Sequence, residues 1–382
     1  MRTTASSTRR RLVAGGAVSL ALVGTLTACG SVDDKLAARD AMHNLRDAKA
    51  ASFTLDLDDP KGELVSVATS ADDERAARLA EDAVIRVTID PAGDTTLGES
   101  SKQGATPSPD PVESLKKSGT LELVWSDGST QVAAVRLVDG VLFARLDPQA
   151  WEKATGSALP LDAATAPQFA TVVDGLKAGK WLKLDLAGAY AKAKAAGLLD
   201  SVAGATGTTP QALDPGALRA LGRDLVDAAD LTTDVSQDGD KTLVKYQVDV
   251  KKSLLAALDV VTEPQYSTLF GRSISASELT QARTSIGKLP DGTPVTGTAT
   301  VESKHLTRAT VDLAGIAKLS QDAKASAITT AKLVVDIDDS PKAVSSPDAG
   351  DTVALDTLVD MALAAAKGGM GGAFSGSTGL TG

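Results

Sequence analysis

Residue types that carry enzyme chemistry are scarce in this sequence. It has one cysteine, Cys29, and two histidines, His43 and His305. His43 falls off the apolar stripe of an expected helix and His305 lies in a polar connection between expected strands. Both are therefore predicted to be solvated surface residues rather than catalytic bases or metal ligands. The signatures H-E-x-x-H and G-x-S-x-G, the phosphate loop and the Rossmann glycine pattern do not occur. The sequence predicts no catalytic residue, no metal site and no cofactor.

Carboxylates leave two further interpretations open. Glycoside hydrolysis needs only a pair of Asp or Glu side chains, but sugar sites also expose aromatic platforms, and this chain has only five Phe, three Trp and three Tyr in 382 residues. Two acidic runs could be read as calcium ligands: Asp56, Asp58 and Asp59, and Asp336, Asp338 and Asp339. They alternate with apolar residues and lack the spacing of an EF-hand loop, which favours solvated strand ends.

The charge balance argues against a nucleic-acid partner. There are 39 basic and 49 acidic side chains, a formal charge of -10, and no Lys/Arg cluster lies beyond the N-terminus. A phosphate backbone would be repelled by such a surface. The hydrophobic content of 43% is sufficient for one large core or two modest ones.

The N-terminal segment is typical of an export signal. Arg2 and the run Arg9 to Arg11 precede an uncharged apolar stretch from Leu12 to Leu26. That stretch is shorter than the roughly 20 residues that cross a bilayer as a permanent helix. Residues 1–28 are therefore predicted to be a cleaved signal peptide.

The residues at the end of this segment carry a resemblance. Leu26, Thr27, Ala28 and Cys29 resemble the lipobox of bacterial lipoproteins. The resemblance implies that the Cys29 thiol carries a diacylglycerol, and that the protein is anchored by it to the extracytoplasmic face of the cell membrane. The alternative is that Cys29 is an incidental cysteine of an ordinary secretory signal.

Alternation of apolar and polar residues dominates the rest of the chain. It is clearest from Thr120 to Leu146, where Asp127-Gly128 and Asp139-Gly140 separate three apolar runs, a pattern typical of a three-stranded meander. The same alternation predicts further strands at Phe53–Leu57, Ile85–Ile89, Leu182–Leu186, Val244–Val250, Val295–Val301, Leu306–Leu313 and Leu333–Ile337. With helices between them, these strands predict an α+β fold built on an antiparallel sheet.

Helix starts and loose segments can also be placed. Ser275 and Glu278 form a capping-box pattern, as do Thr165 and Gln168, and Asp214 can cap a helix begun by Pro215. Residues 92–118 are predicted to be a flexible insertion because they are rich in Gly, Ser, Pro and Thr. Residues 340–382 are predicted to form a tether, a short helix around Val353–Ala366 and a glycine-rich tail.

Two segments of the chain are similar to a known family. The hairpin Val138–Asp147 followed by Trp151, and the segment Gly179–Leu184, resemble actinobacterial lipoproteins of the LppX/LprG type, which are related in shape to the LolA/LolB carriers. The resemblance implies that residues 29–339 form a strongly curved antiparallel β-sheet, a half-barrel, with helices packed on its concave face. In that family the sheet encloses an apolar cavity that holds acyl chains.

Two functions are weighed on this basis. The first is binding or carrying a lipid or acyl chain without catalysis, in a cavity lined by apolar residues of one strand face. The candidates are Leu121, Leu123, Trp125, Val244, Tyr246 and Val248. The second is a structural or protein-interaction lipoprotein of the cell envelope, with a filled core and no ligand; its protein partner is not identified by the sequence. Core packing is also the alternative role for the tryptophans.

Overall fold

The computed structural model describes residues 32–103, 119–159, 169–196, 220–221, 224–225, 228–229, 231–263, 266, 274–320 and 322–367. The described residues form two compact units. The first unit takes those within Met1–Ala83, Thr96–Ala105 and Leu213–Ser340, and the second takes those within Val84–Thr95, Thr106–Ala212 and Pro341–Gly382. Cys29 and the predicted signal peptide lie outside the described part.

The first unit contains six strands in the order β1-β11-β10-β9-β8-β7, and the neighbouring pairs are antiparallel. Its strands are β1 (Ala51–Asp58), β7 (Leu231–Asp238), β8 (Lys241–Asp249), β9 (Pro294–Glu302), β10 (His305–Asp312) and β11 (Lys332–Asp338). Its helices are α2 (Val32–Asp47), α3 (Glu63–Ser66), α4 (Ala71–Asp82), α5 (Leu97–Gln103), α12 (Val250–Val261), α13 (Ala276–Gly287), α14 (Leu313–Leu319) and the 3-10 turn η2 (Ala325–Ala327).

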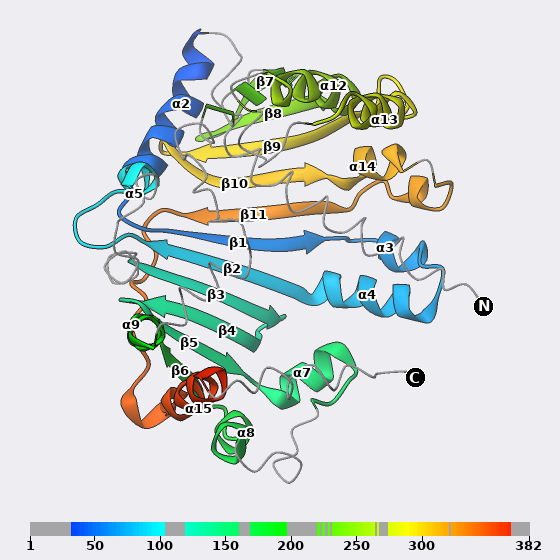
Figure 1. The fold of residues 1–382 in the computed structure, drawn as a ribbon. Helices are drawn as coiled ribbons and strands as arrows, with labels where there is room; N and C mark the ends of the chain where they lie inside the picture. The colour runs from blue at the N-terminus through cyan, green and yellow to red at the C-terminus, as the bar shows by residue number, and fades with distance from the viewer. Residues whose placement is uncertain are drawn as a thin grey trace. The chain divides into compact units, whose positions relative to one another are not determined.

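Helix α2 covers the apolar face of this first sheet at one end of the strands. Figure 1 shows α2 and α5 at that end and α3 and α14 at the other. Ala41, Met42 and Leu45 of α2 are buried against Val301 and Leu306 of the sheet. Burial of these side chains supplies most of the free energy that holds the helix on the strands. The opposite face of the sheet carries Asp, Thr, Lys and Arg side chains, as the alternation predicts.

The second unit contains strands in the order β2-β3-β4-β5-β6-β12. They are β2 (Ala83–Asp90), β3 (Thr120–Asp127), β4 (Thr130–Val138), β5 (Val141–Leu146), β6 (Trp181–Asp185) and β12 (Thr352–Ala354), the last running parallel to β6. The helices are α7 (Pro148–Thr155), α8 (Ala170–Lys177), α9 (Leu186–Ala195), α15 (Asp356–Lys367) and the 3-10 turn η3 (Ala349–Asp351). In Figure 1, α7 lies at one end of β4 and β5, and α9 lies at the other.

The predicted hairpins are present. Asp139 and Gly140 both have positive φ, 50° and 79°, as a two-residue type I′ connection between β4 and β5 requires. A similar turn joins β9 to β10 without glycine: Ser303 and Lys304 have φ of 50° and 69°, and the Lys304 carbonyl accepts a hydrogen bond from Asn44 of α2 at 2.9 Å. The predicted α+β fold on an antiparallel sheet is therefore confirmed.

Three strands end one residue earlier than the alternation predicts. The alternation places Leu186, Val250 and Leu313 in strands, but they are the first residues of α9, α12 and α14. Asp185 and Asp249 cap α9 and α12 by accepting a bond from a backbone N–H of the first turn, whereas Asp312 holds the N-cap position of α14 without such a bond. The capping box at Ser275 and Glu278 begins α13 as predicted.

Within the predicted flexible insertion, Leu97–Gln103 forms α5, with Leu97 packed against the core of the first unit. Within residues 340–382, η3, β12 and α15 belong to the second unit. The capping pairs at Thr165 and Asp214, residues 104–118 and the glycine-rich tail lie outside the described residues.

Candidate functional site

The sheet of the second unit carries apolar side chains in continuous rows on one face. Cross-strand pairing joins Leu121 to Leu137, which pairs with Leu142, which pairs in turn with Leu184. A second row joins Leu123, Val135, Ala144 and Leu182 in the same way. A third joins Trp125, Ala133 and Leu146. Each row runs perpendicular to the strands, so adjacent rows form a continuous apolar surface.

Strand β2 extends this surface by one strand. The guanidinium of Arg86 lies 3.5 Å from the Glu122 carboxylate, so Arg86 and Glu122 point to the same side of the sheet. Since side chains alternate along a strand, Ile85 and Val87 point to the other side, with Leu121 and Leu123. We call the resulting set the apolar face. It consists of Ile85, Val87, Leu121, Leu123, Trp125, Ala133, Val135, Leu137, Leu142, Ala144, Leu146, Leu182 and Leu184.

The centre of the apolar face is open to solvent. Leu121, Leu123 and Val135 are 44%, 41% and 40% exposed, and Ile85 is 38% exposed. Large aliphatic side chains that adjoin one another at this exposure are uncommon on a folded protein and indicate a binding surface. None of the side chains that define the apolar face is charged, so water gains no strong hydrogen bond there.

The opposite face of the same sheet is filled. Val124, Phe143 and Trp181 are buried in one cluster. Glu122, 5% exposed, accepts a 2.7 Å bond from Arg136. The guanidinium of Arg136 lies 4.6 Å from the centroid of the Trp181 ring, within the range of a cation–π contact. The contrast between a packed face and an open one identifies the open one as the candidate functional surface.

An aromatic pair borders the apolar face. The rings of Trp125 on β3 and Trp151 on α7 meet edge to face, with centroids 5.5 Å apart and an interplanar angle of 84°. Helix α7 is held in place by its N-cap Asp147, which accepts from the Gln149 and Ala150 N–H groups, and by a 3.2 Å ion pair between Lys153 and Asp127. The pair therefore forms a fixed wall at one edge of the apolar face.

The six sequence candidates fall in two places. Leu121, Leu123 and Trp125 lie together on the apolar face of the second unit. Val244 and Tyr246 belong to the first unit, where they are 2% and 4% exposed, and Val248 is half-buried there. That any of the six candidates lines a ligand cavity stays a prediction.

Tyr246 is a packed residue with a satisfied hydroxyl. Its hydroxyl donates to the Thr310 carbonyl. Burial, with a contribution from the Asp312 charge, raises the pKa of Tyr246 above its ordinary value. The phenol is therefore a hydrogen-bond donor over the whole physiological pH range.

The partners of Leu121 and Leu123 on β4, β5 and β6 were not among the predicted site residues. The signal was available, because the type I′ turn at Asp139-Gly140 fixes Val138 opposite Val141 and hence Leu137 opposite Leu142. The two-residue turn therefore sets which side chains share the apolar face.

The first unit has a cleft of a different character, with a volume of about 520 Å³. It is lined by Asp58, Pro60, Thr296, Asp312, Ala314, Thr329, Thr330 and Lys332. Asp312 accepts a 2.6 Å bond from the Thr296 hydroxyl and lies 3.8 Å from the Lys332 ammonium. An acyl chain placed in this cleft would remove its charged side chains from water, at a high cost in free energy, so the cleft is a poor site for an acyl chain.

The acidic runs lie at strand ends. Asp336 pairs with Arg308 at 2.5 Å and Asp339 pairs with His305. In the described part of the chain, no three His, Cys, Asp or Glu side chains are grouped so as to hold a metal ion. No helix in that part is long and apolar enough to cross a membrane.

The fold and the site together define an α+β protein with one open apolar sheet face. Among solved structures, the chain is similar to the Mycobacterium tuberculosis lipoprotein LppX, with 7% sequence identity and a TM-score of 0.28 over 83% of this chain and all of that one. No protein-family model matches the chain, and no curated protein sequence does. The likeness is too distant to transfer the role of any residue.

Proposed function

We propose that the apolar face binds the acyl chain of a lipid and that the protein carries or presents this lipid without catalysis. The observation that supports the proposal most is the exposure of Leu121, Leu123 and Val135 in the middle of continuous apolar rows. An acyl chain is the partner that such rows fit, because it has no polar atom to satisfy along its length. Trp125 and Trp151 add a rigid aromatic border that can pack against it.

The energetics suit a reversible carrier. Fully burying a leucine-sized side chain stabilises a complex by roughly 1.5–3 kcal/mol. An acyl chain gains a comparable free energy per area when it enters a bilayer, since both environments remove it from water. Exchange between membrane and protein is then close to balanced, so loading and release need no chemical step.

The same proposal places the protein at the extracytoplasmic face of a cell membrane. The basic residues Arg9 to Arg11, the apolar stretch up to Leu26 and the lipobox at Cys29 support export and acylation. A diacylglycerol on Cys29 would keep the apolar face within reach of the bilayer that supplies its ligand. Fatty-acid labelling of the full chain expressed in a bacterium tests this part. We expect label in the wild-type protein and none in the Cys29→Ala variant; an unlabelled wild-type protein would refute the anchor.

Lipid binding is tested by placing a charge on the apolar face. Leu123→Asp should reduce binding of a fluorescent fatty acid by the full chain at least about tenfold, because a carboxylate must be desolvated beneath the acyl chain. The matched control is Leu254→Asp on α12, which changes an equally exposed leucine, 42% against 41%, that belongs to the first unit and is not part of the apolar face. We expect the control to bind as wild type does.

Two results would refute the proposal. One is equal binding by the Leu123→Asp variant and wild type. The other is a wild-type protein that binds no fatty acid and yields no acyl species on solvent extraction, and this result would favour the structural or protein-interaction role instead.

A further inference from the structure

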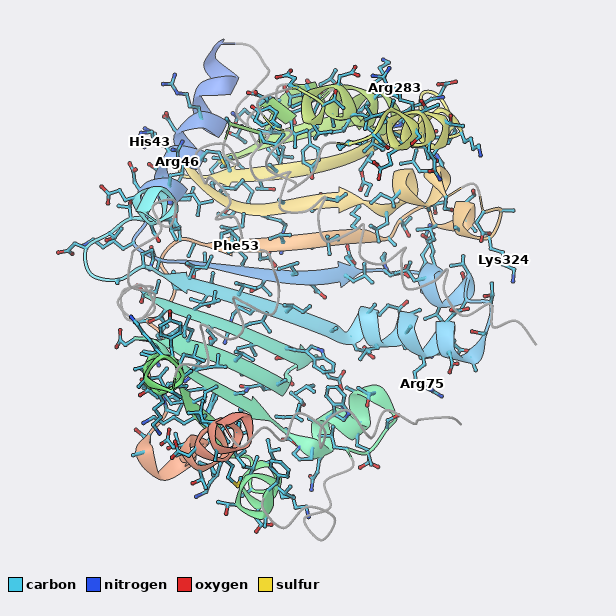
Figure 2. All side chains as sticks on the ribbon, in the orientation of Figure 1. His43, Arg46, Phe53, Arg75, Arg283 and Lys324 are labelled. Atoms are coloured by element: carbon cyan, nitrogen blue, oxygen red, sulfur yellow. The ribbon has the colours of Figure 1, made fainter. Side chains whose placement is uncertain are left out.

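Helix α4 packs on the first unit with half-buried side chains, and none of its residues is fully buried. Its own interactions hold it as a helix: Ser70 caps it by accepting from the Asp73 N–H at 3.1 Å, and Arg78 pairs with Glu74 at 2.8 Å one turn away. Figure 2 shows Arg75 pointing away from the strands, into solvent. Since no residue of α4 is fully buried, its polar contacts with the rest of the unit contribute to holding it in place.

One of those contacts joins two carboxyl groups. Asp59 follows β1, and Glu81 lies in the last turn of α4. Asp59 Oδ1 and Glu81 Oε1 are both shielded from solvent, and neither has a hydrogen-bond donor among the described residues. Asp59 is the neighbour of Glu81 that acts on it both through its charge and through side-chain hydrogen bonding. The other oxygen of Asp59 is already occupied, accepting from the Leu64 N–H at 2.7 Å.

Two ionised carboxylates cannot satisfy this arrangement. Both are acceptors only, so their facing oxygens repel, whereas one proton turns the contact into an O–H···O⁻ hydrogen bond. We propose that a proton shared between Asp59 and Glu81 fastens the last turn of α4 to the end of β1, and that loss of this proton releases it.

The surrounding charges support a proton on Glu81. Burial raises the pKa of Glu81, the Asp59 charge raises it further, and Asp82 adds to this, while Arg78 acts in the opposite direction. The one cation of the β1–α3 connection, Lys61, lies against Glu63 instead, at 3.8 Å. Glu63 itself is turned toward Thr329 and Thr330, whose N–H groups donate to its carboxylate.

The direction of the pH effect follows from the raised pKa. The folded protein holds the Glu81 proton to a higher pH than the unfolded chain does. The contact is therefore complete at pH values below the ordinary pKa of glutamate, and it is lost as the pH rises through the raised value. Because Asp82 is followed directly by Ala83, the first residue of β2, the loosened turn lies at the start of that strand.

Hydrogen exchange of the full chain, read on a peptide that spans Ala71–Asp82 and corrected for the intrinsic effect of pH, tests the proposal. As the pH rises from below the ordinary glutamate pKa of about 4.3 to about 8, protection of this peptide in the wild type should fall by about tenfold, the factor expected for one hydrogen bond to a charged group. The Glu81→Gln variant should keep its protection throughout, because the amide donates permanently to the Asp59 carboxylate.

Asp59→Asn provides a second, independent variant, since the amide that it introduces can donate to the Glu81 carboxylate. The matched control is Asp82→Asn, which removes the adjacent exposed carboxylate but leaves the pair intact; it should retain the fall in protection, moved to lower pH because the Asp82 charge no longer raises the pKa of Glu81. Constant wild-type protection over this range would overturn the proposal. So would an unaltered pH dependence in both Glu81→Gln and Asp59→Asn.

Discussion

The ring of Tyr246 on β8 lies directly over Gly297, its cross-strand partner on β9. From there it reaches across a second strand to donate to the Thr310 carbonyl of β10. A side chain at position 297 would occupy the space of the ring, because a Cβ there would overlap Tyr246 and the Thr310 oxygen. The glycine therefore lets one aromatic side chain lie flat over two neighbouring strands.

We expect Gly297→Ala to destabilise the first unit by about 1–3 kcal/mol, since overpacking forces the ring off its position. The hydrogen bond to Thr310 would be lost as well. Urea unfolding followed by tyrosine and tryptophan fluorescence measures the change. Gly287→Ala, in open space at the end of α13, is the control and should be neutral or slightly stabilising. Equal effects of the two substitutions would contradict the packing role of Gly297.

Glu63 predicts a loss of stability in acid. Its carboxylate accepts from the Thr330 N–H, the Thr329 hydroxyl and the Thr329 N–H, each at 2.7 Å, and these donors lower the pKa of Glu63 from 4.5 to about 2. A depressed pKa in the folded state means that the contribution is complete above pH 4.5 and is lost as the pH falls toward 2. The unfolding free energy should therefore decline over that interval.

Glu63→Gln removes the carboxylate charge but retains a side chain that can form the same hydrogen bonds with Thr329 and Thr330. The amide oxygen can still accept from both N–H groups and the amide nitrogen can donate to the Thr329 hydroxyl, so folding should persist with a slightly lower unfolding midpoint. The acid-dependent decline should become shallower, because the titrating group is gone. A variant with the same decline as wild type would show that other carboxylates cause it.

Substitution of Glu122 is predicted to lower the stability of the second unit far more than substitution of Arg86, the exposed arginine that it contacts. Its side chain is 6% exposed, with Arg136 at 2.7 Å and Arg86 at 3.5 Å. Glu122→Ala should destabilise the second unit by about 3–5 kcal/mol, because Arg136 keeps a partly buried charge without its partner. Arg86, 51% exposed, should contribute less than about 1 kcal/mol when changed to Ala. Thermal unfolding that ranks the two variants the other way would refute this assignment.

The sequence predicted the strands better than their ends. Alternation runs unbroken through Leu182, Leu184 and Leu186, yet the chain turns into a helix at Leu186. The reason is local: Asp185 can accept a hydrogen bond from the Gly188 N–H, and a helix start then competes with another residue of strand. The apolar periodicity depends only on the positions of apolar residues, so it does not detect the hydrogen bond that begins the helix.

Contacts between distant segments could not be predicted at all. The bond between Glu63 and Thr329 joins residues 266 positions apart, and nothing in either segment specifies the other. Part of the apolar face was predictable, because Leu121 and Leu123 alternate with polar residues and the Asp139-Gly140 turn sets the pairing. The exposure of Leu121 and Leu123 was not predictable, because it depends on which other segments cover the face after folding.

The strand-ending aspartates can be tested directly at Asp249. Its side chain, 18% exposed, accepts from the Lys252 N–H at 3.1 Å and begins α12 immediately after β8. Asp249→Ala should lower the unfolding free energy by about 1 kcal/mol, while Asp249→Asn and Asp249→Ser should cost only a few tenths, because both retain a capping oxygen. Asp291→Ala is the matched control: Asp291 is 90% exposed, pairs with Lys251 of the same helix at 2.8 Å and caps no helix, so its loss should cost less than the loss of the cap. Chemical denaturation that finds Asn and Ala equivalent at position 249 would show that the helix begins there for a reason other than its cap.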